Sequence, residues 1–162
     1  MPEQQYPVVE SVVEPRLVAG VRARVLRGQV GQVFGRYLDQ VYVAARAGAV
    51  ELDGQNIFIY RECIGDHLTV DFCVGAKASF SAVGAVLPLH TPAGLAAMTT
   101  HQGDYAGLGA ANAAITAWCR SHDRTLAGPS WEVYGHWNAD PAQLRTDIYY
   151  LLRPAAAARP PG

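Results

Sequence analysis

The sequence repeats itself with a period of about 74 residues. A shift of 74 positions places Ala19 on Ala93 and Gly20 on Gly94. The same shift gives further identities: Ala23 with Ala97, Arg46 with Arg120, Leu52 with Leu126, Gly54 with Gly128, and Tyr60 with Tyr134. After a two-residue slip Asp71 meets Asp147, which indicates a longer hairpin turn in the second copy. Such self-similarity predicts that one supersecondary unit was duplicated and that its two copies pack together.

The first copy has the pattern of a strand, a helix and two strands. Alternating apolar and polar residues predict a strand over 18–26, and apolar spacings of three and four predict a helix over 30–47. Two further strands are predicted over 56–62 and 68–74, joined by a turn at Gly65-Asp66.

The second copy repeats this order. We expect a strand over 94–100, a helix from Gly103-Asp104 to about Ser121 with Asp104 as its N-cap, and strands over 130–136 and 144–152. Residues 8–13 either extend the first strand or add an edge strand. Two βαββ units predict an α+β fold, in which an antiparallel sheet carries both helices on one face and a ligand groove on the other.

The length of 162 residues fits one domain with a core of its own. We expect this domain over 8–152, with repeat 1 at about 16–76 and repeat 2 at about 90–152. Residues 1–7 are predicted to be flexible, and the Pro/Ala-rich tail over 153–162 to be disordered.

Composition excludes several classes of function. The net charge of −1 without a basic stripe argues against nucleic acid as a partner. No apolar run reaches the roughly 18 residues that span a bilayer, and the N-terminus lacks a secretory pattern, so we expect a cytoplasmic protein without a membrane partner. Three widely spaced cysteines (Cys63, Cys73, Cys119) and five histidines without metal-ligand spacing predict reduced thiols, no metal and no cofactor.

The predicted strands present aromatic side chains on one face. Alternation separates Ile57 and Ile59 from Phe58 and Tyr60, and it separates Trp131 and Val133 from Glu132, Tyr134 and His136. We expect the first set of each strand to pack against the helices and the second set to line the open face. In the last strand Asp147 and Tyr149 share one face, and Ile148, Tyr150 and Leu152 share the other.

A carboxylate among aromatic rings is typical of a site for a flat, delocalised cation. Burial without a ligand should raise the pKa of Glu132. The alternatives are that Glu132 is an ordinary exposed strand residue or pairs with Arg22 or Arg24. Trp137 is predicted at a turn, either on the rim of the groove or as a lid over it. Trp118 is expected in the core, and His101 and His136 as hydrogen-bonding surface residues.

Three ordered motifs carry a resemblance to a known family. They are His101, Gly103 and Tyr105 at the helix start, Trp131, Glu132 and Tyr134 on a strand, and Thr146, Asp147, Ile148 and Tyr149 on the closing strand. With the weaker first copy, the pattern covers about residues 8–152 and resembles the GyrI-like family. That family includes effector-binding domains of AraC- and MerR-type multidrug regulators.

The resemblance implies a function and one central residue. Relatives bind lipophilic, often cationic aromatic compounds between the repeats, with a strand glutamate that corresponds to Glu132. Some relatives instead hydrolyse strained cyclopropanes in DNA-alkylating natural products. Asp147 stands where the family commonly has Glu, which puts any contact through that position in doubt. The two copies occupy nearly the whole chain, so we expect a stand-alone protein rather than a transcription factor.

The first predicted function is therefore the binding of aromatic, preferably cationic xenobiotics. Its site residues are Glu132 as charge partner and a cage formed by Phe58, Tyr60, Tyr105, Tyr134, Trp137 and Tyr149. The second is hydrolysis of an electrophilic aromatic compound, with Glu132 as general base and Tyr134 or Tyr149 as hydrogen-bond donor. The third is a protein-interaction or inhibitor module. The sequence leaves the ligand and the oligomeric state open.

Overall fold

The computed structural model describes residues 4–154 and has α+β architecture. The elements follow the order β1 (Val9–Val13), β2 (Leu17–Leu26), α1 (Val30–Arg46), β3 (Leu52–Ile64), β4 (His67–Ala76), β5 (Leu87–His90), β6 (Gly94–Gln102), the 3-10 turn η1 (Tyr105–Gly107), α2 (Leu108–Ser121), β7 (Leu126–Tyr134), the 3-10 turn η2 (Pro141–Gln143) and β8 (Arg145–Leu152). The strands form one antiparallel sheet, as predicted. The alternation pattern found both helices and six strands; it left β1 undecided and missed β5.

The strand order has the same pattern from either edge. The order is β1-β6-β8-β7-β3-β4-β2-β5, so β2-α1-β3-β4 and β6-α2-β7-β8 form two halves that meet at the β3–β7 pair. Each half receives its edge strand from the other, because β1 pairs with β6 and β5 pairs with β2. Such an arrangement is what the predicted duplication would produce, with one short strand added to each expected βαββ unit.

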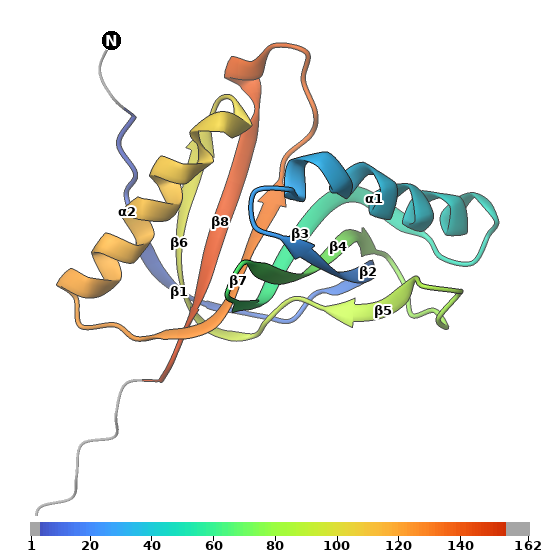
Figure 1. The fold of residues 1–162 in the computed structure, drawn as a ribbon, viewed down its shortest axis with the longest axis horizontal. Coiled ribbons are helices and arrows are strands. Elements are labelled where there is room, and N and C mark those ends of the chain that lie inside the picture. The colour runs from blue at the N-terminus through green and yellow to red at the C-terminus, as the bar shows by residue number, and fades with distance from the viewer. Residues whose placement is uncertain (1–3, 155–162) are drawn as a thin grey trace, which may run out of the picture.

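The sheet is strongly curled, and short connections require this. Val13 ends β1 and Leu17 begins β2, so four Cα–Cα steps cover at most about 15 Å. In a flat sheet, six strand spacings would separate these two strands by about 29 Å. The β1–β2 and β5–β6 connections cross between the halves together (Figure 1), and Arg16 and Thr91 join them through bonds of 2.9 and 3.0 Å.

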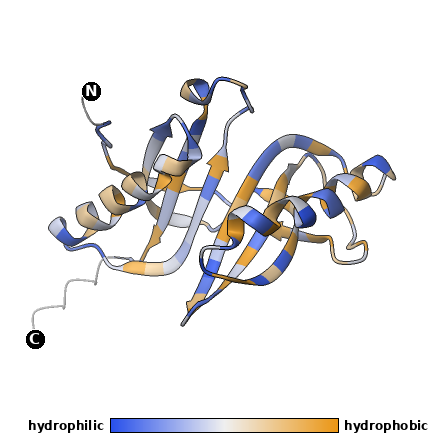
Figure 2. Cartoon of the chain, turned by 45° about the horizontal axis from the view of Figure 1, so that its top comes forward, coloured by the Kyte–Doolittle hydropathy of each residue, from blue (hydrophilic) through white to orange (hydrophobic). Residues whose placement is uncertain are grey.

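The two helices cover the same face of the curled sheet, as predicted. Helix α1 packs in a core cluster with Phe58 and Phe72, and α2 packs in another with Ala97 and Ile148. Paired strand positions join the two clusters across one face, because Phe58 lies opposite both Phe72 and Glu132, and Glu132 opposite Ile148. Figure 2 shows the alternation of hydrophobic and polar residues along the strands beneath the helices.

The predicted assignment of side chains to the two faces was wrong. Ile57, Ile59 and Trp131 lie on the face away from the helices, in a cluster with Val13 and Val18 near the ends of the crossing strands. The curl of the sheet buries these residues without any helix. Phe58, Tyr60, Glu132 and Tyr134 therefore lie on the helix-bearing face, and the predicted groove opens between the helices rather than on the opposite face.

The two ends of the described chain are held by specific contacts. The hydroxyl of Tyr6 bonds to Nδ1 of His101 at 2.8 Å, and the backbone N–H of Arg153 donates to the Thr125 carbonyl at 2.8 Å. Residues 1–3 of the predicted flexible N-terminus and 155–162 of the predicted disordered tail lie outside the described residues. Neither helix described is long and apolar enough to cross a bilayer.

Candidate functional site

A cavity of about 670 Å³ opens between the two halves, on the helix-bearing face. This volume lies within the usual range of small-molecule sites, roughly 300–1,000 Å³. We call it the aromatic cavity. It brings together six of the seven predicted site residues: Phe58, Tyr60, Tyr105, Glu132, Tyr134 and Trp137.

The central strand pair explains why these residues meet. In the antiparallel β3–β7 register, Phe58 lies opposite Glu132 and Tyr60 lies opposite Ser130. Directly opposed side chains in such a pair share a face and lie about 5 Å apart at Cβ. The helices pack over the outer strands of each half, which leaves this central pair as the floor of the cavity.

Glu132 is a buried carboxylate, with only 6% of its surface exposed. Burial raises its pKa, and the hydroxyls of Tyr60 and Tyr134 oppose that rise; the Tyr134 hydroxyl donates to Oε1 at 3.2 Å. Among the described residues no basic side chain forms an ion pair with Glu132. The alternative of a pair with Arg22 is wrong, because Arg22 binds Asp71 at 2.7 Å on the opposite face.

The two tyrosines beside Glu132 are neutral hydrogen-bond donors at ordinary pH. Burial, followed by the negative charge of Glu132, raises the pKa of Tyr60 and that of Tyr134 far above the usual value for a phenol. The cavity therefore contains one ionisable carboxyl group with two phenol groups around it.

Aromatic rings form a continuous wall next to the carboxylate. Phe58 contacts both Phe34 of α1 and Tyr134, with ring centroids 5.6 and 4.9 Å apart. Tyr134 also contacts Tyr105 edge-on at 5.5 Å. Trp137 lies at the rim, 77% exposed.

His101 holds the 3-10 turn η1, which carries Tyr105. The Nε2 of His101 bonds to the Asp104 carbonyl at 2.7 Å, and because a carbonyl only accepts, this nitrogen is the donor. Nδ1 then accepts from the Tyr6 hydroxyl. Asp104, predicted as the N-cap of the helix, accepts from the Ala106 N–H at 2.9 Å and caps η1 instead, whereas α2 begins at Leu108 with Gly107 as its N-cap. His101 is 5% exposed, so the expectation of a surface histidine was wrong.

The model of one protein family matches residues 8–153, nearly all of the chain. Its description is "GyrI-like small molecule binding domain". The chain belongs to the GyrI-like family. No curated protein sequence matches the chain.

Several solved structures have a fold similar to that of this GyrI-like domain. The EcmrR C-terminal domain has a TM-score of 0.74 and 20% identity, over 93% of this chain and 99% of that one. SAV2435 bound to tetraphenylphosphonium has a TM-score of 0.64 and 9% identity, over 93% and 94%. A hydrolase from Listeria innocua has a TM-score of 0.60 and 10% identity, over 90% and 91%. In an EcmrR–DNA complex, with a TM-score of 0.76 and 17% identity over 91% of this chain, the match spans 57% of the EcmrR chain.

Tyr149, the seventh predicted site residue of this GyrI-like domain, lies outside the aromatic cavity. Tyr149 stacks on Trp131 on the opposite face, with centroids 5.1 Å apart and planes 7° apart. The β7–β8 register causes this, because Trp131 lies opposite Tyr149 whereas Glu132 lies opposite Ile148. Tyr149 instead lines a separate cavity of about 380 Å³ that also contains Asp147.

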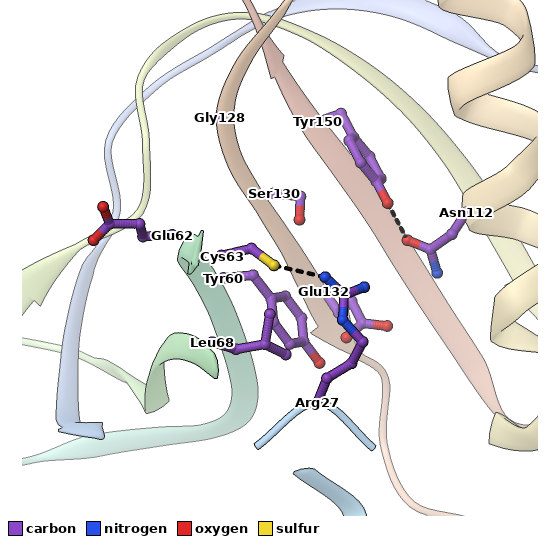
Figure 3. A pocket seen from close by; sticks show the side chains of 10 residues that line it. All are labelled: Arg27, Tyr60, Glu62, Cys63, Leu68, Asn112, Gly128, Ser130, Glu132 and Tyr150. Atoms are coloured by element: carbon purple, nitrogen blue, oxygen red, sulfur yellow. Dashed lines mark hydrogen bonds between the residues drawn. The ribbon is translucent and has the colours of Figure 1, made fainter. Parts of the chain in front are cut away.

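Sequence reasoning missed part of the aromatic cavity. Phe34 and Tyr42 of α1 and Asn56 of β3 also line it, and the Tyr42 hydroxyl donates to Asn56 Oδ1 at 2.8 Å. Phe34 belongs to the spacing of three and four that predicts the helix, and that spacing fits a core position and a cavity wall equally well. A smaller neighbouring cavity, which the sequence did not predict, also has Tyr60 and Glu132 in its wall (Figure 3).

Proposed function

We propose that this protein binds lipophilic, preferably cationic aromatic small molecules in the aromatic cavity, with Glu132 as the charge partner. The observation that carries this proposal is the burial of Glu132 without an ion-pair partner among residues 4–154.

A buried carboxylate without a counter-charge is costly, because the protein interior replaces only part of its hydration. A ligand cation would offset this cost, and the attraction is stronger at low effective dielectric than in water. The surrounding rings would add about 0.5–2 kcal/mol for each face that contacts the cation. Hydrophobic parts of the ligand would pack against Phe34 and Phe58.

The comparisons support this proposal at the level of fold and family. The family is one of small-molecule-binding domains. The structure of SAV2435 contains tetraphenylphosphonium, a cation surrounded by four aromatic rings. That ligand belongs to SAV2435, and it is a suitable first probe for this protein.

The test is a titration with tetraphenylphosphonium and with a fluorescent cationic dye. Glu132→Gln keeps the shape of the side chain and removes its charge, so we expect it to weaken binding about tenfold or more. Glu51→Gln is the matched control, since Glu51 pairs with Lys77 outside the cavity. Saturable binding that Glu132→Gln leaves unchanged would contradict the role of the charge.

Hydrolysis of a strained electrophile in the same cavity is a second candidate. Its supporting observation is the Glu132–Tyr134 hydrogen bond, which places a carboxyl group of raised pKa beside a neutral donor. Glu132 would take a proton from water as the water oxygen bonds to a cyclopropane carbon. The strained C–C bond would break and its electron pair would move onto the electron-withdrawing part of the substrate, to which Tyr134 would donate. Positioned groups of this kind typically contribute 10²–10⁴-fold. Water-added product from a cyclopropane-bearing alkylator, absent with Glu132→Gln, is the expected result.

A further inference from the structure

A second cavity adjoins the aromatic one through two shared residues. It has a volume of about 360 Å³, and Tyr60 and Glu132 contribute to the walls of both cavities. Its remaining lining is mostly polar, and we call it the polar cavity: Arg27, Glu62, Cys63, Leu68, Asn112, Gly128, Ser130 and Tyr150. A molecule that contacts Glu132 can therefore extend in either direction.

Arg27 gives the polar cavity a positive charge. It follows β2, and its backbone N–H donates to the Asp66 carbonyl at 2.7 Å, which fixes the loop. Its guanidinium Nη2 donates to Sγ of Cys63 at 2.6 Å (Figure 3). Within residues 4–154 no carboxylate lies at ion-pair distance from it. Glu62, in the same wall, directs its carboxylate away from Arg27.

Five of the other described arginines form ion pairs with acids, whereas Arg24, Arg36, Arg46, Arg120 and Arg153 form none and line neither cavity. The pairs are Arg16 with Asp53, Arg22 and Arg61 with Asp71, Arg124 with Glu10, and Arg145 with Asp147. What distinguishes Arg27 is its place in the wall of the polar cavity: within residues 4–154 both Arg27 and Glu132, which share that wall, lack an opposite charge at ion-pair distance. A ligand that fills both cavities and matches their charges would carry a cation near Glu132 and an anion near Arg27.

Other side chains of the polar cavity suit a polar group of the ligand. The Tyr150 hydroxyl donates to Asn112 Oδ1 at 2.7 Å, and Asn112 Nδ2 donates to the Leu108 carbonyl at 2.8 Å, which holds both side chains in place. A guanidinium presents several N–H donors in a plane, which matches the two oxygens of a carboxylate.

We propose that the ligand is amphoteric, with a cationic aromatic ring system in the aromatic cavity and a carboxylate or similar anionic group in the polar cavity on Arg27. This inference rests on the proposed function, because it takes Glu132 as the partner of the cation.

The experiment compares rhodamine B, which joins a cationic ring system to a free benzoate, with its ethyl ester, which lacks that negative charge. Fluorescence titrations use wild type, Arg27→Gln and Arg24→Gln. Arg24 is the matched control, since it is exposed on β2 and its removal changes the net charge equally. We expect Arg27→Gln to weaken rhodamine B about fivefold or more and to leave the ester within about twofold, because loss of one charge-assisted contact costs on that order. Arg24→Gln should change neither.

The outcomes separate the two proposals. Equal effects of Arg27→Gln on both dyes, or no effect on either, would overturn the amphoteric ligand while leaving the cation site intact. Binding of the ester that does not depend on Glu132, tested with Glu132→Gln, would overturn the cation site itself. Circular dichroism of each variant verifies that it is folded.

Discussion

The Tyr134 hydroxyl donates a hydrogen bond of 3.2 Å to Oε1 of Glu132, two residues earlier on β7. Side chains two apart on a strand share a face, so this spacing alone directs both into the cavity. A phenol stabilises a carboxylate but does not neutralise it, and burial remains the larger influence on the pKa of Glu132. Within residues 4–154 no basic side chain pairs with this carboxylate, so under the proposed function a ligand cation would supply the opposite charge.

Replacement of Glu132 by Gln should stabilise the unliganded protein at neutral pH. Because the pKa of Glu132 is raised by folding, the folded state binds its proton more tightly than the unfolded state. The free energy of unfolding therefore falls as the pH rises from the pKa of a glutamate in the unfolded chain, near 4.3, to the raised pKa of Glu132 in the folded protein. Above that pH the loss of stability stays constant. We expect Glu132→Gln to be more stable than wild type by about 1 kcal/mol at pH 7 and the difference to vanish below pH 4. Urea unfolding at both pH values measures this, and a mutant less stable than wild type at pH 7 would refute it.

Cation binding should depend on pH through the same group. The carboxylate form attracts a cation and the protonated form does not, so affinity should rise as pH increases through the raised pKa of Glu132 and then level off. Within that range binding should release a proton. Calorimetric titrations with tetraphenylphosphonium in buffers of different ionisation enthalpy detect the release. Glu132→Gln should show neither effect, and a flat pH profile in wild type would exclude Glu132 as the titrating partner.

Two aromatic residues of the cavity should separate binding from stability. Phe58 is 6% exposed and packs on Phe72 at 5.1 Å, so Phe58→Ala should cost about 3–5 kcal/mol of stability. Tyr105 is 38% exposed at the edge of the cavity, so Tyr105→Ala should leave stability within about 1 kcal/mol but weaken an aromatic cation about threefold to tenfold. Thermal unfolding and dye titration measure both. Unchanged dye affinity in Tyr105→Ala would remove that ring from the site.

The sequence predicted local structure well, because its signals are local. The two-residue alternation that placed Glu132 and Tyr134 on one face is confirmed by their shared cavity. The Gly103-Asp104 pair predicted a cap at Asp104, and the hydrogen bond from the Ala106 N–H to its carboxylate forms that cap at the start of η1. Both features depend on residues only a few positions apart.

Features that depend on curvature and register were not predictable in this way. Tyr149 fitted the aromatic cage by its motif, but its pairing opposite Trp131 directs it to the other face. Apolar Ile57 and Ile59 suggested contact with a helix, whereas the curled sheet buries them. The four-residue strand β5 alternates between half-buried and exposed residues, but it is short and contains Pro88, which disfavours a strand, and it is held by its pairing with β2. None of these contacts is local in sequence.

The packing of Gly107 against His101 gives a prediction for the turn that carries Tyr105. A Cβ at Gly107 would lie 2.7 Å from Cε1 of His101, whose ring is fixed by hydrogen bonds at both nitrogens. Either the ring or the turn must move, so we expect Gly107→Ala to cost about 1–3 kcal/mol and to weaken dye binding by displacing Tyr105.

Gly109, two residues later in α2, is the matched control for Gly107. A Cβ there meets nothing within 4 Å, and Ala is favoured over Gly in a helix by about 0.5–1 kcal/mol. Gly109→Ala should therefore keep or raise the melting temperature and leave dye affinity unchanged. If both variants unfold at the same temperature and bind the dye equally, His101 does not hold the turn that positions Tyr105. If only Gly107→Ala loses stability and dye affinity, His101 determines the position of the cavity wall that Tyr105 forms.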